Sequence, residues 1–166
     1  MDFIDSFLKT LHESTGKRVS AKGIIILDNK KILVLRIQTG CHAEGVWDLP
    51  GGGVENNEDL IDCLKREVKE ETNLDLDDES ITPLNITKDF DIPEDGVHAK
   101  WKYYRANAKN GNVVLNPAKW LNGRPEHCEY KWIDNLMDFE QLNLCPEHKK
   151  IVEQELKKLL KHSNKF

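Results

Sequence analysis

Apolar residues recur along the chain in patterns that predict both helices and strands. A helical spacing predicts an amphipathic helix over about residues 2–13 and a C-terminal helix over about residues 146–160. Two apolar runs, 23–27 and 32–37, flank a short polar turn and predict a hairpin. Asn29 lies in that turn, and we expect it to take a positive φ, which asparagine tolerates better than most residues.

The middle of the chain adds further strands and one more helix. Strands are predicted over residues 84–90, 97–107 and 129–133. A helix is predicted over residues 58–72, where Glu58 and Asp59 provide the acidic start that favours a helix N-terminus. Residues 108–128 are rich in turn formers and predict a long surface loop. Strands mixed with separated helices indicate an α/β fold.

Length, charge and the lack of long apolar runs exclude several classes of protein. The chain has 166 residues and no internal repeat, so we expect a single domain over residues 1–166. Its net charge of −5 argues against an extended nucleic-acid surface, although one nucleotide could still bind through a metal ion. The acidic N-terminus is unlike a signal peptide, and no stretch approaches the roughly 18 apolar residues of a membrane helix. We therefore expect a cytoplasmic protein.

The four cysteines are far apart and form no CxxC pair, which favours reduced thiols over a disulfide framework. A metal cluster is the alternative. It would be assembled from Cys41-His42, His127-Cys128 and Cys145 with His148.

Three glutamates on the predicted helix of residues 58–72 are the main candidates for chemistry. Glu67, Glu70 and Glu71 lie at positions i, i+3 and i+4, so their side chains converge on one face of the helix. Carboxylates in this arrangement repel one another, and a hard cation such as Mg²⁺ or Mn²⁺ would offset the repulsion. A solvated acidic face is the alternative interpretation.

The surroundings of these glutamates resemble the signature of the Nudix hydrolase family. The pattern is Gly52, five residues, Glu58, seven residues, Arg66-Glu67-Val68, one residue, Glu70-Glu71, one residue and Asn73-Leu74. Eight of the nine defined positions of the Nudix box match, and the lead-in from Trp47 to Gly52 is also similar. The family has glycine in place of Asn73, which ends the helix in a left-handed conformation. Asparagine is the next-best residue there, so we expect the chemistry to be intact.

The resemblance implies a fold and a set of roles. The fold is a Nudix-type α/β/α sandwich with a central mixed β-sheet. By position, Glu67, Glu70 and Glu71 are the metal ligands, and a Gly52 carbonyl completes the metal shell. Arg66 orients a catalytic glutamate through a salt bridge, so the predicted catalytic residues are Arg66 and these three glutamates. Glu58 is expected to be structural.

Substrate contacts are also implied by the resemblance. Gly51, Gly52 and Gly53 would let the backbone pass close to the phosphates, and Mg²⁺ or Mn²⁺ would be the cofactor. A carboxylate takes the proton from the attacking water. Besides Glu67, Glu70 and Glu71, a loop acid such as Glu126 or Glu129 is a candidate, and Glu129 is a predicted substrate contact.

Two short segments favour one substrate class. Residues 39–47 and 124–132 resemble segments of nucleoside-triphosphate pyrophosphatases of the MutT type. We therefore expect hydrolysis of a (deoxy)nucleoside triphosphate to monophosphate and pyrophosphate, by a monomer or homodimer. Dinucleoside polyphosphates, ADP-ribose or nucleotide sugars, and capped RNA ends are the alternatives. A non-catalytic nucleotide-binding module is less favoured, because all four box glutamates are kept. Several aromatic residues are candidates to stack on a base or to lie in the core: Trp101, Tyr103, Tyr104, Trp120 and Trp132.

Overall fold

The fold is described from a computed structural model of the chain. It describes residues 17–38, 45–92, 97–116, 120–121 and 124–163. The predicted helix over residues 2–13 lies outside this part of the chain.

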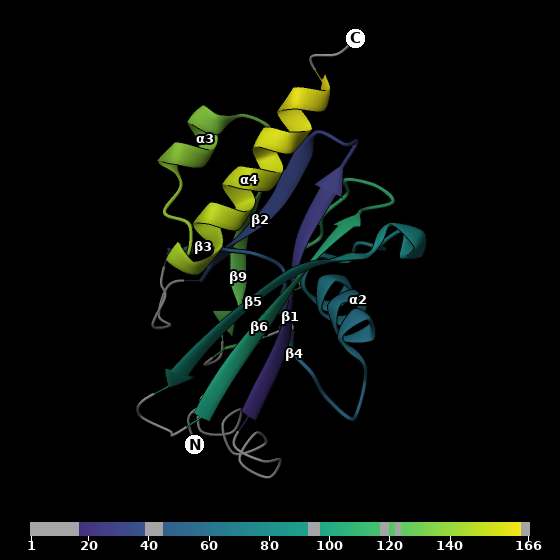
Figure 1. Cartoon of the computed structure of the whole chain (residues 1–166), viewed down its shortest axis with the longest axis vertical. Coiled ribbons are helices and arrows are strands. Elements are labelled where there is room, and N and C mark those ends of the chain that lie inside the picture. The colour runs from purple at the N-terminus through teal and green to yellow at the C-terminus, as the bar shows by residue number, and fades with distance from the viewer. Residues whose placement is uncertain (1–16, 39–44, 93–96, 117–119, 122–123, 164–166) are drawn as a thin grey trace.

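A seven-stranded mixed sheet forms the centre of the molecule (Figure 1). Its strands are β1 (Lys17–Leu27), β2 (Lys31–Ile37), β3 (Trp47–Asp48), β4 (Gly51–Gly53), β5 (Thr82–Ile92), β6 (Val97–Asn107) and β9 (His127–Ile133). The main path runs β3-β2-β1-β6-β5, while β4 pairs with β1 and β9 pairs with β2. Strands β1 and β6 are parallel and the other pairs are antiparallel. The short strands β7 (Trp120–Leu121) and β8 (Arg124–Pro125) form a separate ribbon.

The sheet buries a different apolar layer on each face, because successive residues of a strand point to opposite sides. Ile24 and Ile26 of β1 pack into the cluster that contains the apolar residues of α4 (Pro146–Ser163). Ile25 between them packs into a second cluster with Leu64 and Val68 of α2 (Leu60–Thr72). Helices therefore cover both faces, and the expected α/β/α sandwich with a central mixed sheet is confirmed (Figure 1).

Most of the predicted elements are present with small changes at their ends. The predicted hairpin is formed by β1 and β2, and Asn29 has the expected positive φ of 52°. Helix α4 contains the predicted C-terminal helix. The structure adds a 3₁₀ turn, η1 (Asp78–Ser80), and a short helix, α3 (Leu136–Gln141), that the sequence patterns do not predict.

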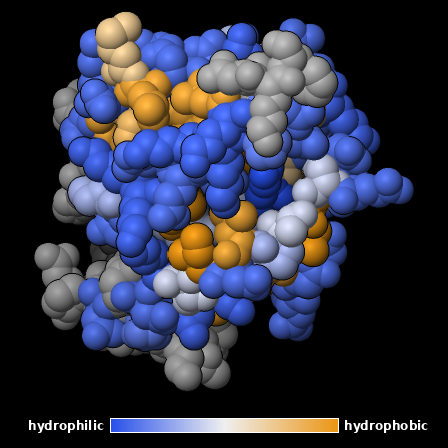
Figure 2. All heavy atoms as spheres, turned by 45° about the horizontal axis from the view of Figure 1, so that its top comes forward, coloured by the Kyte–Doolittle hydropathy of each residue, from blue (hydrophilic) through white to orange (hydrophobic). Residues whose placement is uncertain are grey.

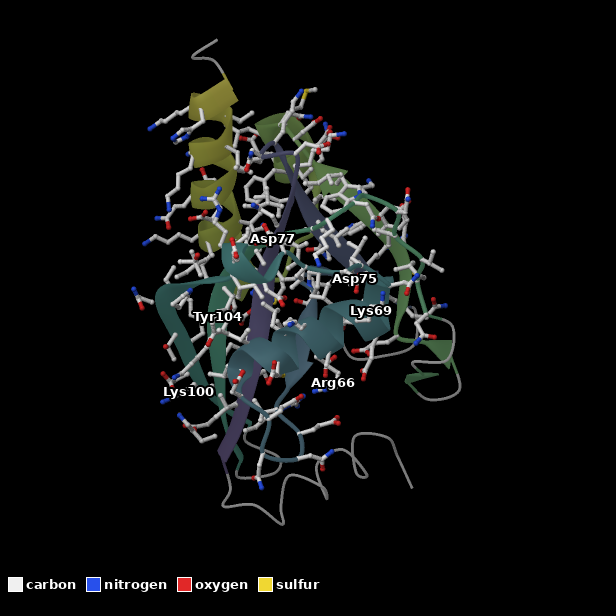
Figure 3. The ribbon with its side chains drawn as sticks, turned by 90° about the vertical axis from the view of Figure 1, so that its right-hand side faces the viewer. Arg66, Lys69, Asp75, Asp77, Lys100 and Tyr104 are labelled. Carbon is white, nitrogen blue, oxygen red and sulfur yellow. The ribbon has the colours of Figure 1, made fainter. Side chains whose placement is uncertain are left out.

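Helix α2 begins two residues later than predicted because Asp59 caps it. The Asp59 carboxylate accepts hydrogen bonds from the backbone N–H groups of Ile61 and Asp62, at 2.9 and 2.8 Å. At the other end, Asn73 is left-handed, with φ 58°, and its N–H donates to the Lys69 carbonyl. The predicted role of Asn73 as the helix cap is confirmed. Figure 3 shows Lys69 beside Asp75 just past this end, where the two form an ion pair.

The prediction of one surface loop over residues 108–128 is wrong in two respects. Residues 120–121 and 124–125 form the β7–β8 ribbon, and residue 127 already belongs to β9. In addition, Val113 and Leu115 pack against the core beneath α2, and the Val114 N–H donates to the Thr72 carbonyl. Polar turn formers dominate the composition of this segment, so the sequence analysis misses the alternation of Val113 and Leu115. These two apolar side chains hold the segment against the end of α2.

The visible surface is mostly hydrophilic, with apolar residues in small patches (Figure 2). Among the described residues, no helix has the length and apolar character needed to cross a membrane.

Candidate metal and catalytic site

The glycine turn before α2 is held by close backbone contacts. Gly51 has a φ of 131°, and a Cβ atom there would lie 2.1 Å from the Ala21 carbonyl oxygen of β1. A Cβ atom on Gly52 would lie 2.5 Å from Glu67 Cδ of α2. Glycine at both positions therefore lets β4 pair with β1 on one side and touch a carboxylate of the helix on the other.

Arg66 of α2, labelled in Figure 3, is the centre of an ion-pair network. Its guanidinium donates to Glu58 at 2.6 Å, to Glu67 at 2.8 Å and to the Gly53 carbonyl at 3.0 Å. The hydrogen bonds with Glu58 raise the pKa of Arg66 despite its partial burial, and Arg66 lowers the pKa of Glu58. The predicted salt bridge between Arg66 and a glutamate of the box is therefore present, with Glu67 as the partner. The hydrogen bond to the Gly53 carbonyl joins α2 to the glycine turn.

The other two box glutamates differ in how firmly they are held. Glu71 is buried, and its Oε2 accepts a hydrogen bond from the Gly51 N–H at 3.0 Å. The side chain of Glu70 is 43% exposed, and its contact with Arg66 is 3.4 Å. Glu71 is therefore part of the turn, whereas Glu70 reaches toward solvent.

Two residues at the start of β9 join the same region. Glu126, Glu71 and His127 each place one possible ligand atom so that all three atoms lie within 4.8 Å of one another. His127 is buried, and its Nδ1 lies 3.9 Å from Glu71 Oε1. The sequence suggests Glu126 as a loop acid but does not predict that His127 lies beside Glu71, because this contact depends on the pairing of β9 with β2 in the sheet.

The charges of this region are unbalanced in favour of carboxylates. Three cations face them: Arg66, Arg18, which interacts electrostatically with Glu67 and Glu126, and Lys22, which interacts electrostatically with Glu71 and Glu126. Burial lowers the pKa of Arg18 to about 10, which still leaves it charged at neutral pH. The carboxylates outnumber these three cations and are Glu58, Glu67, Glu70, Glu71 and Glu126.

This donor set fits a divalent metal ion. Mg²⁺ and Mn²⁺ prefer carboxylate and carbonyl oxygens, and a bound cation would offset the excess of negative charge. The Gly52 carbonyl, a predicted ligand, lies over α2 and accepts from the Cys63 thiol at 3.4 Å. Burial raises the pKa of that thiol to about 12, so Cys63 stays a neutral donor rather than a competing thiolate ligand.

A second polar network lies on the opposite face of the sheet, below α4. The Lys22 ammonium donates to Asp48 at 3.0 Å and to the Gly51 carbonyl at 3.4 Å. The other Asp48 oxygen lies 2.6 Å from His148 Nε2, and His148 Nδ1 lies 2.9 Å from the Tyr103 hydroxyl. Burial opposes the charge on both Lys22 and Asp48. The attraction of Asp48 and Glu71 nevertheless raises the pKa of Lys22, and Lys22 and His148 together lower the pKa of Asp48.

The remaining predicted residues lie outside this constellation. Glu129 forms an ion pair with Arg36 at 3.1 Å, and both side chains are more than 40% exposed. Its predicted substrate contact stays a prediction. Tyr103 and Tyr104 are buried in the two cores, as the alternative to base stacking expects, and Trp101 stacks against His148. The side chain of Trp120 lies outside the described residues.

The structure separates the residues of the proposed cysteine–histidine cluster. His127 lies with Glu71 and Glu126, whereas His148 lies with Asp48 and Cys145. The Cys128 thiol is exposed and donates to the Arg36 carbonyl instead. Residues 41 and 42 fall outside the described part of the chain.

Comparison with known proteins identifies the family. The NUDIX domain profile matches residues 17–155, and the chain therefore belongs to the Nudix family. The predicted class, a Nudix hydrolase, is confirmed at this level.

Proteins of similar sequence also include Nudix hydrolases. The chain is 29% identical over 120 residues to an RNA pyrophosphohydrolase of Pelagibacter ubique, covering 68% of this chain and 73% of that protein. It is 38% identical over 79 residues to Nudix hydrolase 2 of Arabidopsis thaliana, covering 47% of this chain. The match spans only 28% of the length of the Arabidopsis protein.

Solved structures support the fold. A MutT NUDIX hydrolase from Burkholderia pseudomallei superposes with a TM-score of 0.63 at 26% identity, covering 83% of this chain and 97% of that one. The NUDIX domain of Shewanella oneidensis NrtR, in complex with ADP ribose, gives a TM-score of 0.67 at 20% identity, covering 89% and 92%. The second likeness concerns the fold alone.

Proposed function

We propose that the chain is a divalent-metal-dependent pyrophosphohydrolase that converts a (deoxy)nucleoside triphosphate into a monophosphate and pyrophosphate. The observation that carries the proposal is the excess of carboxylates that α2 and β9 gather around the glycine turn. The likeness to a MutT NUDIX hydrolase supports this substrate class. The proposed working unit is a single domain, active as a monomer or homodimer in the cytoplasm.

Each residue of the box has a distinct task in this proposal. Glu67, Glu70, Glu71 and the Gly52 carbonyl would hold Mg²⁺ or Mn²⁺, which neutralises the diphosphate and lowers the pKa of a bound water. Arg66 keeps Glu67 in place and joins it to Glu58, so the carboxylates do not have to reorganise when substrate binds. The backbone of Gly51 to Gly53 would pass close to the phosphates.

The proton acceptor must reach a water molecule that attacks phosphorus. Glu67 is buried against Arg66, and one oxygen of Glu71 is bound by the Gly51 N–H. Glu70 is the most exposed of the three and has the longest contact with Arg66. This exposure favours Glu70 as the general base.

A second candidate substrate is the 5′ end of an RNA. Several relatives are named RNA pyrophosphohydrolase, including the one from Pelagibacter ubique. An RNA end needs only the same site for its phosphates, and the acidic charge of the chain disfavours further contacts along the strand.

Product identification across a substrate panel tests the proposal. We expect nucleoside triphosphates with Mg²⁺ or Mn²⁺ to yield monophosphate and pyrophosphate, the latter detected as phosphate only after inorganic pyrophosphatase is added. A chelator should abolish the release. If triphosphates are inert while RNA 5′ ends, dinucleoside polyphosphates or ADP-ribose turn over, the leading substrate is wrong. If nothing turns over, the chain is a binding module.

A further inference from the structure

His127 owes its position to a β-bulge at the start of β9. Arg36 pairs with Glu129 and Ile37 pairs with His127, so Cys128 is an extra residue between two consecutive pairs. A bulge of this kind redirects the side chains on either side of it. His127 is thereby buried at 7% exposure, while Cys128 and Glu129 face outward.

The contact between His127 and Glu71 has an unusual length. Nδ1 of His127 lies 3.9 Å from Oε1 of Glu71, whose other oxygen accepts from the Gly51 N–H. A distance of 3.9 Å is too long for a hydrogen bond. It lies within the span of about 4.2 Å that two ligands can have when each is about 2.1 Å from one ion.

Glu126 completes this group from the same end of β9. Its backbone carbonyl accepts from the Gln38 N–H at 2.9 Å, which fixes the residue beside His127. Each of Glu71, Glu126 and His127 contributes one ligand atom within 4.8 Å of the others. The group therefore offers two oxygens and one nitrogen from two elements that are each held by backbone hydrogen bonds.

We propose that His127 supplies a nitrogen ligand to the metal site, beside Glu71 and Glu126, so that the chain favours Mn²⁺ or Co²⁺ over Mg²⁺. The inference rests on the proposed function, because it assigns a further ligand to the same metal. An imidazole is a poor ligand for Mg²⁺, which prefers oxygen, whereas affinity for nitrogen rises along the first-row transition metals. In this proposal His127, which the bulge at Cys128 turns inward, sets the metal preference of the site.

The direct test is to detect the nitrogen on the bound ion. Mn²⁺ is added to the metal-free full chain without nucleotide, and ¹⁴N coupling is measured by electron spin echo envelope modulation. We expect imidazole coupling in the wild type, its loss in His127→Gln, and its retention in the control His162→Gln. His162 is exposed near the end of α4, where its ring bonds to the Lys158 carbonyl.

Calorimetry of the same proteins gives a second readout. His127→Gln should weaken Co²⁺ binding by about tenfold or more and change Mg²⁺ binding by less than about twofold. If His127→Gln does not fold, His127→Asn replaces it, because its shorter amide cannot reach the same ion position.

Two results would overturn the proposal. One is Mn²⁺ bound to the wild type without ¹⁴N coupling, and the other is equal Co²⁺ affinity in the wild type and the His127 variant. Pyrophosphate release with Mg²⁺ separates this failure from a failure of the proposed function. An enzyme that binds metal through oxygen alone and still releases pyrophosphate contradicts only the role of His127.

Discussion

Two networks of charged residues flank the same glycine turn, and they differ in how their charges balance. On the α4 side, Lys22 pairs with Asp48, and the neighbouring partners are His148 and Tyr103. On the α2 side, Arg66 binds Glu58 and Glu67, and further carboxylates remain. Lys22 balances the charge of Asp48 in the first network. In the second, the carboxylates outnumber Arg18, Arg66 and the same Lys22, which also interacts electrostatically with Glu71 and Glu126, so an excess of negative charge remains.

The comparison teaches that a buried ion pair and a metal site differ in their balance of charge more than in the kinds of residue they contain. Asp48, Cys145 and His148 also place ligand atoms within 4.8 Å of one another. Lys22 already neutralises Asp48, and burial raises the pKa of the Cys145 thiol to about 12, so it stays protonated. We therefore interpret this group as a structural support for the turn, which Lys22 reaches through the Gly51 carbonyl.

The largest expected effect comes from breaking the balanced network. Lys22→Met leaves Asp48 buried without its cation, and we expect a loss of about 3–5 kcal/mol in the free energy of unfolding. The double variant Lys22→Met/Asp48→Asn should be more stable than Lys22→Met by at least about 1 kcal/mol, because the uncompensated charge is gone. Urea denaturation measures both. A double variant less stable than the single one would contradict the pairing.

The next effect concerns catalysis and separates the two networks. Glu71→Gln should lower kcat by about 10²-fold or more while the fold persists, because it removes a carboxylate from the proposed metal site. Glu140→Gln, the same change at an exposed position of α3, is the control and should leave kcat unchanged. Steady-state kinetics of pyrophosphate release measures kcat for the wild type and both variants. Wild-type turnover by Glu71→Gln would remove this residue from the site.

Low pH should reduce the stability that both networks contribute to the fold. The substitution Glu58→Gln isolates the contribution of the Arg66 network. Arg66 depresses the pKa of Glu58 below its ordinary value of 4.5. A depressed pKa contributes stability that is present above pH 4.5 and is lost as the pH falls through the lower folded value. Glu58→Gln should therefore flatten the acid side of the stability curve below pH 4.5. Denaturation curves across that range measure the slope, and an unchanged slope would argue against the contribution of Glu58.

The smallest expected effect is at the end of α2. Asn73 is left-handed with φ 58°, so Asn73→Gly should be neutral or stabilising by less than about 1 kcal/mol. Asn73→Val should cost more, because a β-branched side chain resists positive φ. Melting temperatures compare the two variants. Equal values would show that the left-handed conformation carries no energetic cost here.

The sequence predicts the box network far better than the network below α4. Residues of the box lie on one helix and one adjoining turn, so their spacing alone places the carboxylates together. Lys22, Asp48 and His148 come from three separate elements, and only the pairing of β1 with its neighbours and the packing of α4 bring them into contact.

The same reasoning explains the position of His127. Simple alternation along β9 would put residues 127 and 129 on one face. The bulge at Cys128 places His127 and Glu129 differently, and no local sequence pattern predicts this bulge. Periodicity and spacing thus predict the α/β class and the convergence of Glu67, Glu70 and Glu71. The resemblance to the Nudix family adds the sandwich and the Arg66 salt bridge, and neither predicts contacts that depend on strand register.

The central claim is that the excess of carboxylates beside the glycine turn is a divalent-metal site. Calorimetric titration of the metal-free protein with Mn²⁺ tests it most directly, with Glu71→Gln and the control Glu140→Gln titrated in parallel. The account predicts saturable binding in the wild type and in Glu140→Gln, weakened by about tenfold or more in Glu71→Gln. Equal binding by all three proteins, or none by the wild type, would contradict it.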